Sequence, residues 1–354
     1  MDINQSRLSN QLLTNPKPTV YEIVKHMACI QSQEFKQSQR AIASRGLDIS
    51  QQDIYNAYNS WQIVRTWTQR GTIHTVATED AWWILQLCAS KTLAWFARRR
   101  ENLWISDDIN KALDIIKTNL KWRSMNRADI VQKIKDNGID IQTWRAYHII
   151  CYAATLWIIA RWPIVNDEQE YILLDDWVKN PRDLSGDEAL AELTLRYFVS
   201  HGPATIQDFA RWSGLWVTQI RKWLELCGDK LYIYQRDGLT YYHWEISQDI
   251  PKQNKEWIFL AWFDELLLWY KDRTDTLHID HHTLVDPARN GIFKPTVIID
   301  GIHIATRSTK STKKQNIIYI KPFENISNQE IEILKKWIYK YSKFTNIDWE
   351  IEIL

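Results

Sequence analysis

One order of elements recurs along the chain, and it constrains the fold more than any other feature of the sequence. It is clearest over residues 187–247, where a predicted helix ends at Gly202-Pro203 and Thr205 begins a second, short helix. Gly214 ends that helix, and a third amphipathic helix follows. Asp237-Gly238 then joins two tyrosine-rich runs as a hairpin. The segment is therefore predicted to form three short helices and a two-stranded hairpin.

The same order occurs twice upstream. Residues 107–174 contain two short helical segments, a longer third one and two β-rich runs. Near the start, Thr19 and Ser50 each begin a helix with a capping-box pattern, and residues 62–76 have the composition of a hairpin. Three helices followed by a hairpin is the winged-helix plan, a variant of the helix-turn-helix. We therefore predict three tandem winged-helix units.

The end of the chain has a different pattern. Residues 257–321 are rich in strand-forming residues, with hairpin turns expected near Asn290-Gly291 and Asp300-Gly301. Ser327 then begins a helix, and residues 347–354 form a last strand. This pattern predicts a small β-barrel-like domain, or a sheet, with one helix packed on it.

These patterns together predict an α+β, helix-rich fold in which tandem winged-helix (helix-turn-helix) units precede a C-terminal β-barrel-like domain. A chain of 354 residues is too long for one ordinary domain. We place four domains on it: winged-helix unit 1 over residues 1–105, unit 2 over 106–186, unit 3 over 187–250, and the C-terminal β-rich domain with one helix over 251–354.

Several classes of protein are excluded or disfavoured. Glycine is scarce, and neither G-x-G-x-x-G nor G-x-x-x-x-G-K-[ST] occurs, so the usual nucleotide cradles are absent. The dispersed cysteines Cys29, Cys88, Cys151 and Cys227 predict buried free thiols rather than a zinc site or disulfide frame. Residues 1–10 contain no signal-peptide core, and the longest apolar run is far shorter than the roughly 20 residues of a membrane span. We expect a cytoplasmic protein that is not embedded in a membrane.

The net charge of +1 conceals an uneven distribution. Residues 1–105 carry 12 Lys and Arg against 8 Asp and Glu, whereas residues 187–250 carry 6 against 9. A winged helix that binds DNA alone is expected to be basic, because phosphate neutralisation dominates affinity. The first unit and the C-terminal domain are therefore expected to form a concave DNA-binding face, braced by the other two units.

Enzyme signatures such as G-x-S-x-G and H-E-x-x-H are missing. The histidines His278, His281 and His282 cluster without the spacing of a known metal site, so we predict neither a metal nor a cofactor.

A series of short motifs carries the most specific signal, and it runs through nearly the whole chain in order. The motifs are Cys29-Ile30-Gln31-Ser32-Gln33-Glu34, VRTWTQRGTIH over residues 64–74, HGPAT over 201–205, DFARWSG over 208–214, FDELLLWYKDR over 263–273 and NGIFKPTVIIDG over 290–301. Together they resemble the AlkZ/YcaQ-like family of winged-helix DNA glycosylases. Two departures stand out: Ser32 replaces the usual aliphatic residue between the two glutamines, and Ala305-Thr306-Arg307 replaces the family's Gly-Thr-Trp.

The resemblance implies a monomeric DNA repair enzyme without a cofactor. It would hydrolyse the N-glycosidic bond of N7-alkylated, cationic purines in double-stranded DNA, including purines that form interstrand cross-links. The catalytic residues it implies are Gln31 and Gln33. The candidate nucleic-acid-binding residues, taken from the matched motifs and from a basic stretch in the C-terminal domain, are Arg65, Arg70, Thr72, His74, Lys271, Arg273, Arg307, Lys310, Lys313 and Lys314.

The chemistry of such a reaction suits glutamine. An alkylated purine is a cation and leaves as a neutral molecule, so a strong general acid is not needed, and the transition state resembles an oxocarbenium ion. A glutamine amide can orient a water molecule without ionising. Residues i and i+2 share one face only in an extended segment. Gln31 and Gln33 therefore cooperate in one cleft, near the hairpin segment Arg70–His74, only if the chain has left its helix by about Ile30.

Alternatives remain open at each position. Gln31 and Gln33 are also typical of polar residues at a helix end, and the hairpin residues from Arg65 to His74 of a structural hairpin. Asp264, Lys271, Asp272 and Arg273 suit a buried ion-pair network that holds the C-terminal domain. The second class of function is a non-catalytic, regulatory winged-helix DNA-binding protein. The glutamine pair and the acidic third unit favour the enzyme.

Overall fold

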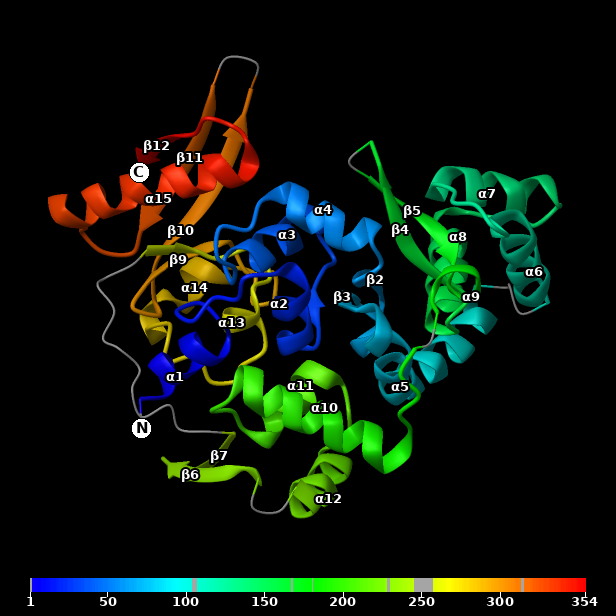
Figure 1. Cartoon of the computed structure of the whole chain (residues 1–354), viewed down its shortest axis with the longest axis horizontal. Coiled ribbons are helices and arrows are strands. Elements are labelled where there is room, and N and C mark those ends of the chain that lie inside the picture. The colour runs from blue at the N-terminus through cyan, green and yellow to red at the C-terminus, as the bar shows by residue number, and fades with distance from the viewer. Residues whose placement is uncertain are drawn as a thin grey trace.

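The computed structural model describes residues 2–103, 107–166, 168–179, 181–227, 230–244, 257–312 and 315–354 (Figure 1). Its α-helices are α1 (Ile3–Asn10), α2 (Val20–Met27), α3 (Phe35–Ala43), α4 (Gln51–Asn59), α5 (Ala81–Asn102), α6 (Ile109–Leu120), α7 (Arg127–Asp136), α8 (Thr143–Thr155), α9 (Leu174–Trp177), α10 (Gly186–His201), α11 (Ile206–Ser213), α12 (Val217–Cys227), α13 (Glu265–Leu268), α14 (His282–Val285) and α15 (Asn328–Thr345). Its strands are β1 (Ile30–Gln31), β2 (Ile63–Trp67), β3 (Ile73–Ala77), β4 (Ile159–Val165), β5 (Glu168–Leu173), β6 (Tyr232–Arg236), β7 (Leu239–His243), β8 (Trp257–Phe259), β9 (Thr296–Ile299), β10 (Ile302–Ser311), β11 (Asn316–Pro322) and β12 (Glu350–Ile353).

The helix starts expected from capping patterns are confirmed. Each cap side chain accepts a hydrogen bond from the third residue of its helix, which satisfies one otherwise unpaired amide. The capping residues are Thr19, Ser50, Asn126, Thr205 and Ser327. All three predicted hairpins are also found, in the predicted order after their helices.

The first two hairpins share one sheet, which sequence patterns did not indicate. Its strand order is β1-β3-β2-β4-β5, so the β2–β3 hairpin is flanked on both sides. Strands β2 and β4 pair where Arg65 faces Arg161. Every residue of β2 and β3 is buried. The third hairpin, β6–β7, forms a separate two-stranded sheet whose first strand is largely exposed.

The C-terminal region forms a second five-stranded sheet in the order β12-β11-β10-β9-β8, with α15 packed on it through Leu334 and Tyr341. Among the described strands, β8 and β12 each pair with one neighbour, so the sheet is open and the barrel-like prediction is not met. The turn at Asp300-Gly301 joins β9 to β10 as expected. The hairpin expected at Asn290-Gly291 is wrong, because α13 and α14 occupy the span between β8 and β9.

The first helix connects distant parts of the chain. Asn4 and Gln5 donate hydrogen bonds to the carbonyl oxygen of Asp300, and Arg7 donates to that of Pro203. Gln11, directly after α1, donates to the hydroxyl of Tyr270. The N-terminus is thereby fixed to both the third helical unit and the C-terminal sheet region.

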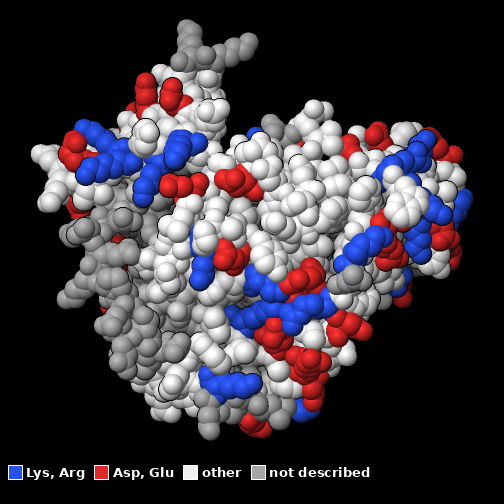
Figure 2. Space-filling view, in the orientation of Figure 1, with Lys and Arg blue, Asp and Glu red and all other residues white. Residues whose placement is uncertain are grey.

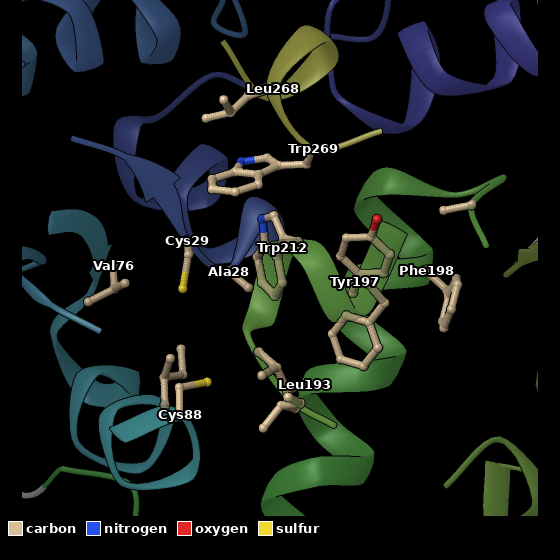
Figure 3. Close-up of a cluster of buried hydrophobic side chains, with 14 of the residues drawn as sticks. Ala28, Cys29, Val76, Cys88, Leu193, Tyr197, Phe198, Trp212, Leu268 and Trp269 are labelled. Atoms are coloured by element: carbon tan, nitrogen blue, oxygen red, sulfur yellow. The ribbon is translucent and has the colours of Figure 1, made fainter. Parts of the chain in front are cut away.

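A large buried core lies between these parts. Figure 3 shows Trp212 of α11 beside Ala28, with Cys29 and Cys88 nearby and Trp269 next to it. Cys29, Cys88 and Cys151 are free and buried, as predicted, and burial raises the pKa of Cys88 and of Cys151 to about 12. None of the helices in the described part of the chain has the length and apolar character needed to cross a membrane.

Candidate active site

The glutamine segment begins where α2 stops. Ala28 has a φ of +60°, a backbone conformation that side-chain-bearing residues rarely adopt, and it ends the helix. The next residues form β1, which pairs with β3 so that Ile30 faces Thr75 and Gln31 faces His74. The chain has therefore left the helix before Ile30, which is the condition for Gln31 and Gln33 to lie on one side of an extended segment.

Two buried charged side chains hold this segment by its backbone. The carboxylate of Glu265 accepts a hydrogen bond from the Gln31 amide at 2.8 Å. The guanidinium of Arg65 donates to the Ser32 carbonyl oxygen at 2.8 and 2.6 Å and to that of Gln33 at 3.0 Å. Its remaining nitrogen donates to Gln169 Oε1 at 3.1 Å. Charge-assisted bonds of this kind are stronger than neutral ones, so the segment is held firmly.

Ser32 is accommodated by a chain of buried hydroxyl groups. Its Oγ donates to the Ile30 carbonyl oxygen and lies 2.6 Å from Thr75 Oγ1, which in turn lies 2.6 Å from the Tyr58 hydroxyl. Ser32, which stands where the family has an aliphatic residue, thus places its hydroxyl among hydrogen-bonding partners, and the buried hydroxyl is not left unpaired.

A cleft of about 710 Å³ opens beside the segment, between the start of α3 and the β4–β5 hairpin. Gln33 and Glu34 are exposed and line it. Gln31 is half-buried and is not among the lining residues, so the prediction that both amides enter one cleft is met only for Gln33. The other lining residues are Phe35, Lys36, Gln37, Arg65, Asn126, Arg127, Arg161, Val165, Asn166, Glu168, Gln169, Glu170, Tyr171 and Trp262.

The two amide groups are oriented by the backbone. Gln31 Oε1 accepts from the Ser32 amide at 3.1 Å, and Gln33 Oε1 accepts from the Ile73 amide at 3.4 Å. A carbonyl oxygen has two lone pairs, so each amide keeps one acceptor position. Gln33 therefore presents both an acceptor and an NH₂ group at the wall of the cleft.

Three residues predicted to contact DNA are buried instead. Arg65 is 3% exposed and donates only to the protein, and burial together with the neighbouring Arg161 lowers its pKa to about 10. His74 is 1% exposed, and burial lowers its pKa to about 3, so it is neutral. Arg307 is 4% exposed and donates to the Leu260 carbonyl oxygen. None of these side chains is available to a phosphate, and their hydrogen bonds assign them structural roles.

Three more predicted contacts, of which Arg70 is exposed and Thr72 and Arg273 are half-buried, are engaged with the protein. Arg70 donates to the Arg211 carbonyl oxygen and its guanidinium stacks over Trp269. Thr72 donates to the Gln69 carbonyl oxygen. Arg273 donates to the carbonyl oxygens of Leu267 and Leu268, and burial lowers its pKa to about 10.

Lys271 and Lys310 are exposed, so their side chains are accessible to DNA. They lie in different places, directly after α13 and near the end of β10. Lys313 and Lys314 lie outside the described residues. Figure 2 shows that, on the face drawn, basic side chains in the lower centre lie next to acidic ones and form no continuous basic surface.

The alternative interpretation of the FDELLLWYKDR segment, a buried ion-pair network, is met at its first acidic residue, Asp264. Arg45 donates two hydrogen bonds of 2.9 Å to Asp264, and both side chains are buried. Its neighbour Glu265 also accepts from Trp212 Nε1 at 3.2 Å and lies 3.4 Å from His201 Nε2. The role of Glu265 was missed from sequence. The available signal was an acid inside an otherwise apolar run, since such an acid needs buried partners.

Metal ligands do not gather in the described part of the chain, where no three His, Cys, Asp or Glu side chains lie close enough to share an ion. Of the clustered histidines, His278 lies near Asp280 and His281 near Glu324.

Comparison with known proteins identifies the family. The model of the AlkZ-like DNA glycosylase family matches residues 24–344. The chain belongs to this family. AlkZ-like proteins are DNA glycosylases, which hydrolyse N-glycosyl bonds, and this membership decides for the enzyme over the regulatory alternative. The resemblance drawn from the short motifs is thereby confirmed.

Two relatives support the assignment. An AlkZ-like protein from Streptomyces sahachiroi, described as "Interstrand DNA cross-link repair glycosylase", is 22% identical over 318 residues, which cover 83% of this chain and 84% of that protein. The solved structure of DNA glycosylase AlkZ from the same organism superposes with a TM-score of 0.81 at 18% identity, covering 100% of this chain and 98% of that one. The second similarity concerns the fold, which is a helix-rich α+β fold in both.

Proposed function

We propose that this AlkZ-like glycosylase excises N7-alkylated purines from double-stranded DNA, and that Gln31 and Gln33 are its catalytic residues. The observation that carries the proposal is Gln33 at the wall of a cleft, on a segment held by two buried charged groups. The name of the Streptomyces sahachiroi relative supports extending the substrates to interstrand cross-links.

The leaving group sets what the site has to supply. As the bond from the sugar C1′ to purine N9 breaks, its electron pair neutralises the positive charge of the alkylated base, and water forms the new bond to C1′. A strong acid is therefore not required. The site needs an oriented water molecule and partial negative charge near the sugar.

Gln33 and its neighbour meet these needs in the cleft. The free lone pair of Gln33 Oε1 orients the water, because the other lone pair is held by the Ile73 amide. Glu34 is exposed on the same wall and supplies negative charge as well as a group that accepts the proton of the water. The side-chain carbonyl of Gln31 accepts from the Ser32 amide, and Gln31 adds a second amide group to the same segment.

The architecture supports DNA binding by tandem winged-helix units with the boundaries 1–105, 106–186 and 187–250. Three helices precede the hairpin in the second and third ranges and four in the first, and helices followed by a hairpin is the order of that motif. We further propose that the protein acts as a monomer in the cytoplasm.

Single-turnover excision on a duplex with one N7-methylguanine tests the proposal. We expect Gln33→Ala and Gln31→Ala to lower the excision rate by about 30- to 100-fold, equivalent to roughly 2–3 kcal/mol. DNA affinity is expected to change little, because phosphate contacts supply most of it. Gln52→Ala is the matched control, since this amide is exposed on α4 and donates to Asn56.

Two results would contradict the proposal. Wild-type rates in both glutamine variants would show that the pair is structural. Normal DNA binding by the wild-type protein without any release of the base would assign it to binding alone.

A further inference from the structure

The side chain of Arg161 has no hydrogen-bonding or ion-pairing partner in the part of the chain that the structure describes. It lies directly opposite Arg65 where β4 pairs with β2. Like charges that face each other across two strands repel, and a buried donor without an acceptor costs free energy. The Nε of Arg161 is such a buried, unpartnered donor. The structure therefore shows a guanidinium without an ion pair among the described residues, although the carboxylates of Glu34, Glu168 and Glu170 line the same cleft.

The position of Arg161 is fixed by aromatic rings. Its guanidinium carbon lies 5.5 Å from the ring centre of Trp67 and 5.2 Å from that of Tyr171, and both rings are buried. Such contacts hold a guanidinium in one place without neutralising its charge. The guanidinium of Arg65, by contrast, donates to the backbone of the glutamine segment. Of the two facing arginines, Arg161 is therefore the one whose guanidinium lacks a partner among the described residues.

The cleft lining holds a second, exposed arginine that favours an anion. Arg127, the first residue of α7, lines the cleft, is exposed and has no ion-pair partner among the described residues. The start of a helix adds partial positive charge there.

We propose that this part of the cleft binds one phosphodiester group of the DNA backbone, with Arg161 as its principal ligand and Arg127 as an additional donor. The inference rests on the proposed glycosylase function and adds a positioning site to it. Planar guanidinium groups bind phosphate oxygens in pairs, which fixes orientation as well as distance. Because Gln33 lines the same cleft, a phosphate held at Arg161 would set the position of the damaged nucleotide relative to the catalytic amide.

Substitution of single phosphates tests the site. The lesion duplex is prepared as a set in which one phosphate at a time, on either side of N7-methylguanine, is replaced by an uncharged methylphosphonate. We expect the wild-type excision rate to fall about 10- to 100-fold at one position and much less at the others. On the unmodified duplex, the excision rate of Arg161→Ala is expected to be lower than that of the wild type by a comparable factor. Replacing the sensitive phosphate by methylphosphonate is expected to lower the rate of this variant no further.

Two variants provide controls. Arg161→Lys keeps the charge without the planar fork and is expected to recover only part of the rate. Arg221→Ala removes an exposed arginine of α12 and is expected to leave every duplex unaffected. Thermal unfolding of each variant confirms that its fold is retained.

Equilibrium binding of the same duplex set separates this proposal from the proposed function. If the wild type releases no base, the glycosylase proposal fails, and a position-specific loss of affinity that Arg161→Ala does not share still supports the phosphate site. If Arg161→Ala excises and binds every duplex as the wild type does, the proposal of a phosphate site is wrong. An equal loss at every modified phosphate would also overturn it, because it would indicate diffuse electrostatic attraction only.

Discussion

The β2–β3 and β6–β7 hairpins have the same local plan and opposite surroundings. Both follow a series of helices and join two β-rich runs by a short connection, residues 68–72 in the first and Asp237-Gly238 in the second. β2–β3 lies between β1 and β4 with every strand residue buried, whereas β6–β7 forms its own sheet with a largely exposed first strand. In the first hairpin, Arg65 and Thr75 therefore hold the glutamine segment. The comparison shows that a hairpin of this type can become the internal support of a candidate active site.

The largest expected difference concerns one arginine in each hairpin. Arg65→Met leaves the carbonyl oxygens of Ser32 and Gln33 without their donor, and we expect the free energy of unfolding to fall by about 3–5 kcal/mol. Arg236→Met in β6 removes two 2.7 Å bonds to Asp275 from a side chain that is 30% exposed, and about 1 kcal/mol is expected. Urea denaturation measures both, and equal losses would remove the distinction between the hairpins.

Acid is expected to weaken the buried hairpin through His74. Its folded-state pKa of about 3 lies below the ordinary value of 6.5, so the unfolded chain binds more protons between these values and stability falls as the pH falls. From pH 6.5 to pH 5 the loss from this residue is about 2 kcal/mol. The stability of His74→Gln is expected to depend less on pH by that amount.

Denaturation midpoints of the two proteins between pH 7.5 and pH 5 provide the measurement. Asp80, whose pKa is lowered to about 2, loses its contribution only below about pH 4 and does not interfere. Identical pH profiles for wild type and His74→Gln would show that the histidine titrates freely, contrary to its burial.

A smaller effect is expected for the hydroxyl chain. Thr75→Val removes the group that links Ser32 to Tyr58, and we expect a loss of about 1–2 kcal/mol in unfolding free energy. Thr240→Val in β7 is the matched change in the other hairpin and is expected to stay within about 0.5 kcal/mol. If Thr75→Val is as mild as Thr240→Val, the chain of hydroxyls contributes nothing to stability.

The smallest effect is expected at the exposed strand. Ile233 in β6 is 63% exposed, so Ile233→Thr is expected to change the unfolding free energy by less than about 0.5 kcal/mol. Its thermal midpoint should match that of the wild type. A clear destabilisation would indicate that this strand is covered by another surface in solution.

Local structure could be predicted from the sequence because its causes are local. Capping residues such as Thr205 and turn residues such as Asp237-Gly238 act within a few positions, and both predictions are confirmed. The sharing of one sheet by two hairpins depends on pairing between β2 and β4, about a hundred residues apart, for which no local pattern exists.

The candidate site was predictable in part for the same reason. Motifs located Gln31 and Gln33, and the i, i+2 argument anticipated an extended segment. The same motifs placed Arg65 and His74 at the DNA, because a sequence shows a charge without its burial. Arg161 was missed, since only the sheet brings it opposite Arg65.

The anchoring of α1 has a consequence for synthesis of the chain. Asn4 donates its hydrogen bond to Asp300, which lies 296 positions further on, and Arg7 binds Pro203, 196 positions away. The partners of α1 are therefore synthesised long after α1 itself, and contacts of such long sequence separation form slowly. Until then Ile3 and Leu8, both buried in the finished protein, stay exposed on the nascent chain.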